Sequence, residues 1–243
     1  MYIPPPFRET QLDVLHSLIR AHSFGTLVSQ VNGELFATHL PFLLDPARGE
    51  HGTLTGHMAR ANPHWQSFLQ HQLEQSMAVF LGPHAYISPS WYASPRNVPT
   101  WNYIAVHAYG IPSIVDNPQR VREILETTVR TFEAGSPNPW STAGLPEAYI
   151  ADMSKAIVAF EMPITRLDGK RKLGQNRTTP DILGAADGLL AQHDSNGDAI
   201  AQWMLEVATE RAAPAPRGGS PRLRLAVRRP RYLGHRSNGK AGG

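Results

Sequence analysis

The sequence predicts a mainly β fold with peripheral α-helices, in which roughly six strands form a barrel-like sheet. Short apolar stretches bounded by turn residues predict the strands. Helical patterns are interspersed among them, without the regular strand–helix alternation of a doubly wound fold. At 243 residues with 41% hydrophobic content, the chain is long enough to bury one good core, as one large domain or one domain with an appendage.

The first third of the chain predicts a helix, a hairpin and two further strands. Leucine and isoleucine recur at helical spacing over residues 10–20, and Asn32-Gly33 between two apolar stretches favours a tight hairpin turn. Asn62 followed by Pro63 is typical of an N-cap and a first helical position, so a helix is expected from there to about Leu73. The two further strands are expected at residues 52–58 and 76–82.

The next segment, Gly82–Tyr109, is rich in large rings and in proline. Large rings bury much area with few rotatable bonds, and proline restricts the backbone around them. The segment therefore predicts one or two strands that carry either a stiff aromatic surface for a flat ligand or a partner, or rings that simply fill a core. The residues concerned are Tyr86, Trp91, Tyr92, Trp101, Tyr103 and Tyr109, with Pro83, Pro89, Pro95 and Pro99.

The second half predicts four helices and a final strand. Asn117 and Pro118 begin the clearest helix, whose apolar residues recur at three- and four-residue spacing until Gly135 ends it. A short helix near residues 146–155 precedes the apolar stretch 156–167, which predicts the last strand. Two closing helices are expected around residues 182–190 and 200–207.

The composition excludes several classes of protein. The chain has no cysteine, which excludes disulfides, thiolate catalysis and Cys-ligated metal sites and fits a reducing compartment. Its start lacks the features of a signal peptide and no run of about 18 apolar residues occurs, so a cytoplasmic protein without a membrane span is expected. Residues 212–243 hold eight of the 23 Lys and Arg residues and no acidic residue, which leaves 15 against 20 Asp and Glu in residues 1–211.

The body is thus acidic and the tail basic. The tail is rich in Pro, Gly and Arg without apolar periodicity, which predicts disorder. It could bind phosphate backbones through non-specific electrostatics, or be an inert extension or a stretch of altered reading frame. The predicted organisation is a barrel domain at residues 1–175, a C-terminal helical region at 176–211 and the tail at 212–243.

A candidate anion site lies where the third strand is expected to end. A strand ending near Met58 and a helix beginning at Pro63 would bring Arg60 together with the free N–H groups of the first helical turn. The guanidinium fork matches phosphate oxygens, and His57 is a second donor on the same turn. Such junctions are also common structural features, so the pattern alone leaves both interpretations open.

A second basic stretch, Gly169–Arg177, is expected just after the last strand. Lys170, Arg171 and Lys172 are either an ordinary solvated charge run or, with Gln175 and Asn176 behind them, cations and amides suited to a ring edge rich in carbonyl and N–H groups. Together, the anion junction, the aromatic segment and the amides describe a phosphorylated, flat, heteroaromatic ligand better than a metal or a sugar.

Motifs for other chemistries are missing from the sequence. It has no G-x-G-x-x-G after a strand, no G-x-x-x-x-G-K-[ST], no H-E-x-x-H and no G-x-S-x-G, which argues against dinucleotide, P-loop, zincin and nucleophilic hydrolase sites. A His-only metal or haem site stays open, because His39, His57, His84 and His107 fall at or near predicted strands, although such histidines are more often satisfied core or ligand contacts.

Six stretches, in order, resemble the PaiB-like family of FMN-binding negative transcriptional regulators: HLPFLLD, GTLTGHMARANPHW, VFLGPHAYISPSWY, VPTWNYIAVHAYG, PW and GKRKLGQNR. The match covers essentially Met1 to about Arg211. The resemblance implies a split β-barrel related to flavin reductase and pyridoxamine phosphate oxidase folds. It also implies FMN as the cofactor and a homodimer with flavin at or near the subunit interface.

The resemblance assigns two sets of cofactor-binding residues. The first set is implied to approach the flavin phosphate and ribityl chain: His57, Met58, Ala59, Arg60 and Asn62. The second set matches the family's aromatic block and its Lys–Gln–Asn stretch: Tyr86, Ser88, Trp91, Trp101, Asn102, Lys170, Gln175 and Asn176. Two subunits can share one cofactor in such barrels, so the sets need not come from a single chain. The sequence departs from the family at Gly174, where many relatives have Ser, and in its basic tail.

Three functions follow from this pattern. The resemblance implies a flavin-binding negative transcriptional regulator. No recognition helix is predicted and an acidic body repels DNA, so direct DNA binding would depend on the tail or on a partner protein. The alternatives are an FMN-dependent oxidoreductase, for which no acid or base is identified, and, less favoured, a haem-handling split barrel.

Overall fold

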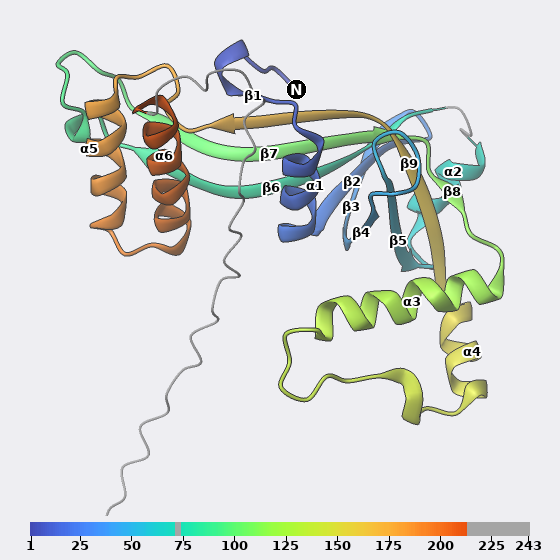
Figure 1. Ribbon diagram of the computed structural model, residues 1–243. Coiled ribbons are helices and arrows are strands. Elements are labelled where there is room, and N and C mark those ends of the chain that lie inside the picture. Colours follow the sequence, from blue (N-terminus) through green and yellow to red (C-terminus); the bar gives the residue numbers. More distant parts are fainter. Residues whose placement is uncertain (71–73, 213–243) are drawn as a thin grey trace, which may run out of the picture.

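The structure is a computed structural model that describes residues 1–70 and 74–212. Three long strands run through the molecule, two helices lie at one end of them, and a helical arm projects at the other end (Figure 1). The expected helix end at Leu73 lies outside the described residues. Apart from Ala212, so does the predicted tail.

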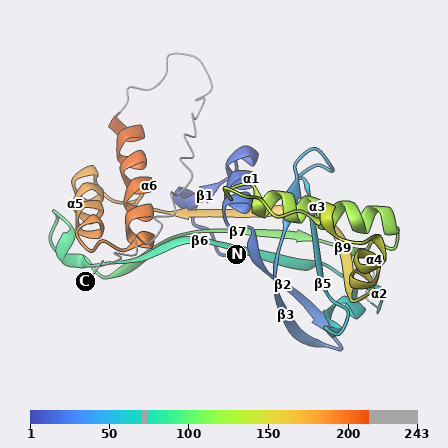
Figure 2. The ribbon, with the colours of Figure 1, turned by 90° about the horizontal axis from the view of Figure 1, so that it is seen from below.

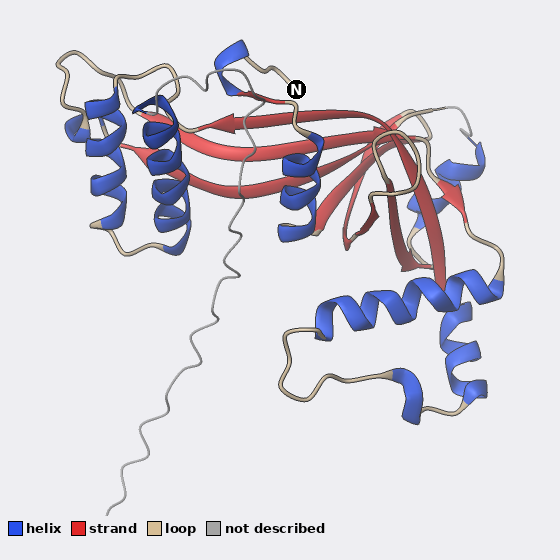
Figure 3. Ribbon diagram, viewed as in Figure 1, coloured by secondary structure: helices blue, strands red, loops and turns tan. Residues whose placement is uncertain are grey.

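The strands form one sheet in which every pair is antiparallel (Figure 3). Its order is β3-β2-β6-β7-β9-β5-β4, with β1 and β8 also paired to β9, so the described strands do not close into a continuous barrel. The prediction of a mainly β fold with peripheral helices is confirmed. The strands are β1 Arg8–Glu9, β2 Phe24–Val31, β3 Glu34–Pro41, β4 Leu43–Asp45, β5 Thr53–Ala59, β6 Ser76–Ile87, β7 Thr100–Gly110, β8 Ser113–Ile114 and β9 Ile157–Lys172.

The helices begin where the sequence signals them. Asn117 accepts a hydrogen bond from the Arg120 amide as the cap of α3, and Asn62 accepts one from the His64 amide. The second cap, however, begins a four-residue 3-10 turn, η2, before the short α2. The helices are η1 Pro5–Phe7, α1 Leu12–Ala21, η2 Pro63–Gln66, α2 Ser67–Gln70, η3 Pro89–Trp91, α3 Pro118–Glu133, η4 Thr142–Gly144, α4 Glu147–Lys155, α5 Thr179–Leu190 and α6 Ser195–Ala212.

The β2–β3 hairpin turns at Asn32-Gly33, as predicted. Both residues have positive φ, 53° and 84°, which an Asn-Gly pair adopts with little strain. The eight residues of each strand then pair without a shift, from Val31 with Glu34 to Phe24 with Pro41.

Two strands are longer than the sequence predicts. β6 continues past Gly82 through an irregularity in its pairing between Leu81 and His84 and ends at Ile87. β9 continues to Lys172, so the basic stretch that was expected to follow the last strand begins inside it. Because residues 169–172 belong to a strand, successive side chains of the basic stretch point to opposite faces of the sheet.

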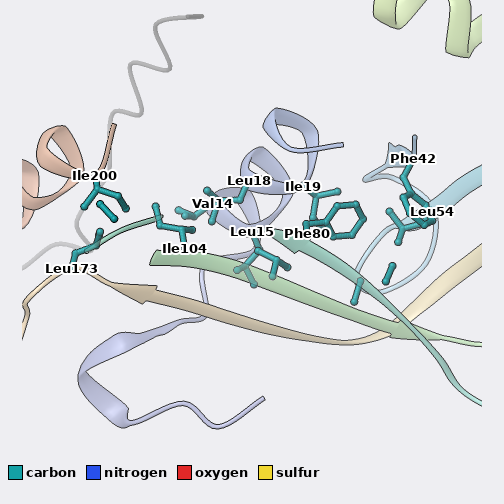
Figure 4. Close-up of a cluster of buried hydrophobic side chains, with 14 of the residues drawn as sticks. Val14, Leu15, Leu18, Ile19, Phe42, Leu54, Phe80, Ile104, Leu173 and Ile200 are labelled. Carbon is teal, nitrogen blue, oxygen red and sulfur yellow. The ribbon is translucent and has the colours of Figure 1, made fainter. Parts of the chain in front are cut away.

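The core lies between the sheet and the helices α1, α5 and α6. Figure 4 shows it as a row of apolar side chains that runs from Phe42 and Leu54, through Leu15 of α1, to Leu173 and Ile200 at the α5–α6 end. All of these side chains are buried. The helices therefore cover one face of β6, β7 and β9 (Figure 2).

The helical arm, α3 to α4, is joined to the sheet at its root. The Glu161 carboxylate on β9 accepts hydrogen bonds from both Arg48 and Arg120, the second of which belongs to α3. The apolar face predicted for α3 is present, but Ile124 is its one buried residue. Phe132 is 49% exposed on the same helix, while the other members of this face are partly buried.

Candidate functional site

The first predicted set of site residues lies at the end of β5. His57 and Ala59 pair with Ala159 and Ile157 at the start of β9. The His57 side chain is half-buried, and burial lowers its pKa, so the imidazole is held in its neutral form. Met58 points the other way and belongs to the buried core.

The donors of Arg60 and Asn62 are partly used by the chain itself. The Arg60 Nε and Nη2 donate to the backbone carbonyls of Lys155 and Ile157, at 2.7 and 2.8 Å. Asn62 Nδ2 donates to Thr38 Oγ1 at 3.1 Å, while its Oδ1 caps the η2 turn. Within the part of the chain that the structure describes, Arg60 Nη1 has no protein acceptor. Arg60 Nη1 thus remains as a donor for an external anion at the predicted anion site, and the half-buried His57 lies three residues earlier in the chain.

Part of the second set lies on the face of β6, β7 and β9 that α1, α5 and α6 leave uncovered (Figure 2). Tyr86 lies directly opposite Trp101, with ring centroids 6.0 Å apart. Their side chains are 45% and 54% exposed, an unusual exposure for large rings on a sheet. We call this surface the open face and define it by the residues that share it: His84, Tyr86, Trp101, Tyr103, Lys170 and Lys172. Lys170 is only 7% exposed, because Tyr2 of the N-terminal segment contacts it there.

Two lysines stand beside these rings. Lys170 Nζ donates to the Tyr2 carbonyl at 3.2 Å and lies 4.9 Å from the centre of the Tyr103 ring. Lys172 Nζ donates to the Trp101 carbonyl at 2.6 Å and to Thr100 Oγ1. Burial, with the nearby charges of Lys170 and Arg177, lowers the pKa of Lys172.

The remaining predicted residues of this set have other surroundings. Asn102 is buried on the opposite face and donates to Met204 Sδ at 3.3 Å. Gln175 folds back onto its own loop, donating to the Arg171 carbonyl and accepting from the Leu173 amide. Ser88 Oγ caps the η3 turn, and Asn176 is exposed.

Trp91 packs against α5. A Cβ added to Gly184 would overlap the Trp91 carbonyl, and one added to Gly188 would overlap its indole ring. These two glycines, four residues apart, lie on one side of the helix and leave a notch that the indole fills. Trp91 thus ties the β6–β7 connection to α5.

The two sets are far apart in the single chain. Ala59 pairs with Ile157 at the first residue of β9, whereas Tyr103 pairs with Lys172 at its last. The 15 steps from residue 157 to 172 correspond to up to about 50 Å of extended strand. Figure 1 shows the start of β9 beside α4 and its end near α6. One chain therefore does not bring the predicted phosphate-binding and aromatic groups into one pocket.

Lys172 and Tyr103 share the open face. The sequence placed them in the basic stretch and in the aromatic segment, but the cofactor-binding residues that the resemblance assigned did not include them. The period of two along each strand places Lys172 on the face of Lys170 and Tyr103 on that of Trp101. For Lys172 this signal could not be used, because the basic stretch was expected to follow the last strand rather than to begin within it.

Other parts of the described chain offer different features. A cleft of about 500 Å³ opens between β1, α1 and the middle of β9, and none of the predicted site residues lines it. Among the described residues, no group of His, Asp or Glu is arranged to hold a metal ion. No helix in this part of the chain combines the length and apolar character needed to cross a membrane.

Solved structures with a similar fold include flavin-binding proteins. The chain resembles the flavocytochrome Anf3 of Azotobacter vinelandii with a TM-score of 0.51 and 15% identity, over 69% of each chain. It resembles the FAD and heme binding protein of Mycobacterium smegmatis with a TM-score of 0.52 and 13% identity, over 69% of this chain and 74% of that one. At such low identity, these similarities establish the fold alone.

Sequence relatives are closer. The chain is 35% identical over 204 residues to the "Protease synthase and sporulation protein PAI 2" of Bacillus subtilis, which covers 84% of this chain and 96% of that protein. It is 30% identical to an uncharacterised protein of Emericella nidulans, over 85% of this chain and 97% of the relative. Residues 1–166 match the family described as "Putative FMN-binding domain". The expected cofactor, FMN, is thus confirmed by the family, and the chain belongs to this FMN-binding family together with the PAI 2 protein.

Proposed function

We propose that this protein binds FMN in sites shared between two copies of the chain, and that the flavin-loaded dimer is a negative regulator of transcription. The observation that carries the shared site is the separation of the two residue sets along β9. The two ends of this 16-residue strand lie at opposite ends of the molecule (Figure 1), too far apart for one FMN molecule to contact both within one chain. A second copy can supply the distant set.

The residues at each end suit different parts of FMN. At the β5 end, the free Nη1 of Arg60 and the half-buried His57 suit the phosphate, because a guanidinium forms strong charge-assisted hydrogen bonds with phosphate oxygens. On the open face, the exposed rings of Tyr86 and Trp101 suit the flat ring system. Bound FMN would supply redox chemistry, while the chain's residues bind it, orient it and exclude water.

A two-fold dimer would contain two identical sites. In such an assembly each contact occurs twice, so each site would combine the β5 end of one chain with the open face of the other. The uncovered apolar surface of the arm and the open face offers area for this contact. The regulatory part of the proposal is supported by the family resemblance and by the name of the PAI 2 relative, which refers to sporulation.

A mixing experiment tests the shared site. Arg60→Ala damages one end and Trp101→Ala the other, so each variant alone should retain little FMN. In a mixed dimer, one site carries both substitutions and the other carries neither. After random exchange, half of the dimers are mixed and about one quarter of all sites are intact. FMN retention, measured by absorbance after desalting, should recover to this level. No recovery on mixing, with exchange verified by tagged chains, would overturn the shared site.

The regulatory output is tested separately by transcript measurements. Cells that carry the wild-type gene, a deletion or the Arg60→Ala variant are compared, and the same set of transcripts should rise in the last two. Unchanged transcripts, combined with steady oxidation of NADH or NADPH by the flavin-loaded protein, would instead favour the oxidoreductase alternative.

A further inference from the structure

Lys170 and Lys172 carry positive charge on the open face without a carboxylate to neutralise it. Within the described residues, neither ammonium group takes part in an ion pair, although Arg166 and Arg171 on the same strand each pair with a carboxylate. Their partners are a ring and neutral oxygens: Tyr103 and the Tyr2 carbonyl for Lys170, and the Trp101 carbonyl and Thr100 for Lys172.

Of the two lysines, Lys172 is the one whose ammonium group is held next to the exposed rings. It lies directly opposite Tyr103, and its two hydrogen bonds hold the ammonium group over the first residues of β7, next to the exposed Trp101. An ammonium group has three N–H donors, so one remains for a further acceptor. Arg177 adds positive charge nearby while it stacks over Tyr92 at 4.8 Å.

A partly buried cation without a counter-ion is costly unless an anionic or strongly polar group meets it. We propose that Lys172 meets the carbonyl-rich edge of the bound flavin ring and stabilises the reduced ring more than the oxidised ring. This inference rests on the proposed FMN site, because it assigns a role to a residue of the open face within that site.

The expected effect follows from charge. The oxidised ring is neutral, and uptake of two electrons and one proton leaves one negative charge on the reduced ring. A fixed cation at the ring edge therefore binds the reduced form more tightly and raises the reduction potential, which is one of the ways in which a protein tunes a flavin. In the test, dithionite supplies the two electrons and the buffer supplies the proton.

The test compares Lys172→Met with Lys172→Arg and with Arg20→Met. Arg20 is exposed in the last turn of α1, on the side of the sheet opposite the open face, so its substitution removes one positive charge outside the proposed site. The midpoint potential of bound FMN is measured by dithionite titration against a reference dye, and the affinities for FMN and riboflavin by flavin fluorescence. For Lys172→Met, the ratio of the reduced to the oxidised dissociation constant should rise about tenfold, a lowering of the two-electron potential by about 30 mV. The other two variants should keep the wild-type potential.

The outcomes separate this inference from the proposed function. If Lys172→Met binds FMN with an unchanged potential, or weakens oxidised and reduced FMN equally, the ring-edge role is wrong while the FMN site stands. If it weakens FMN but not riboflavin, the lysine meets the phosphate, and the inference is likewise overturned. Should Lys172→Met fail to fold, as judged by circular dichroism, Lys172→Gln replaces it. If the wild-type protein binds no FMN, the proposed function itself fails.

Discussion

The guanidinium of Arg60 donates to the carbonyls of Lys155 and Ile157 and keeps Nη1 for an external acceptor. A hydrogen bond to a charged group contributes about 1.5–3 kcal/mol, and each 1.4 kcal/mol corresponds to about tenfold in affinity. Arg60→Ala should therefore weaken FMN binding by about 10- to 100-fold. Riboflavin has the same ring without the phosphate, so its affinity should change less than about twofold. Fluorescence titrations with the two ligands measure both values.

Because Arg60 also holds the end of α4, its substitution needs a control for folding. Arg60→Lys keeps a positive charge but loses the planar fork, so it should bind FMN with intermediate affinity. Thermal unfolding of each variant shows whether the loss of the two carbonyl contacts has spread to the sheet. An equal loss of FMN and riboflavin affinity in a folded Arg60→Ala protein would contradict a role at the phosphate.

At the scale of elements, the arm is fixed by a carboxylate with an unusual pKa. Hydrogen bonds from Arg48, and with them those from Arg120, lower the pKa of Glu161 to about 2, while burial opposes the shift. A carboxylate with a depressed pKa stabilises the folded state above its unfolded pKa, here about 4.5, and this stabilisation is lost as the pH falls to about 2. Solvent screens both arginines, so the effect should be only about 1 kcal/mol.

Urea unfolding of the wild type and of Glu161→Gln measures this contribution. The wild type should be the more stable protein at pH 7, the difference should shrink between pH 4.5 and pH 2, and it should vanish below that range. A difference that stays constant across this range would show that the arm root is held by packing rather than by the ionised carboxylate.

Local signals in the sequence predicted the elements better than their lengths. Asn117-Pro118 and Asn32-Gly33 restrict the backbone within a few residues, so the start of α3 and the β2–β3 turn were predicted correctly. The ends of β6 and β9 depend instead on pairing with strands distant in sequence. A basic stretch such as residues 170–172 has no apolar pattern of its own, and its pairing with β7, and at Lys170 also with β1, makes it a strand.

The same limit applies to the candidate site. Residue types and family motifs identified both ends of it, but the distance between them is set by the pairing of β9 with β5 and β7. Side-chain direction was equally hidden, since Asn102 and Trp101 are neighbours in sequence but lie on opposite faces of the sheet. The chemistry that sequence reasoning assigns to the two ends therefore stays a prediction, whereas their separation emerged only from the sheet topology.

At the scale of the whole molecule, a site shared by two chains couples flavin binding to assembly. If FMN binds only the dimer, each FMN molecule stabilises the dimer over the separated chains by mass action. At a free FMN concentration ten times the dissociation constant of the site, each of the two sites contributes a factor of about 11, so the dissociation constant of the dimer should fall by about 100-fold. By reciprocity, the apparent affinity for FMN should rise with protein concentration.

Sedimentation velocity over a dilution series, with and without FMN, measures this coupling directly. The wild type should remain a dimer in FMN at dilutions where the FMN-free protein dissociates, and Arg60→Ala should need a higher FMN concentration for the same shift. The arm and the open face would be covered in the dimer, so FMN should also protect their amide groups from hydrogen exchange. A monomer that binds one FMN at high dilution with undiminished affinity would contradict the shared site. The two ends of β9 would then have to bind different ligands.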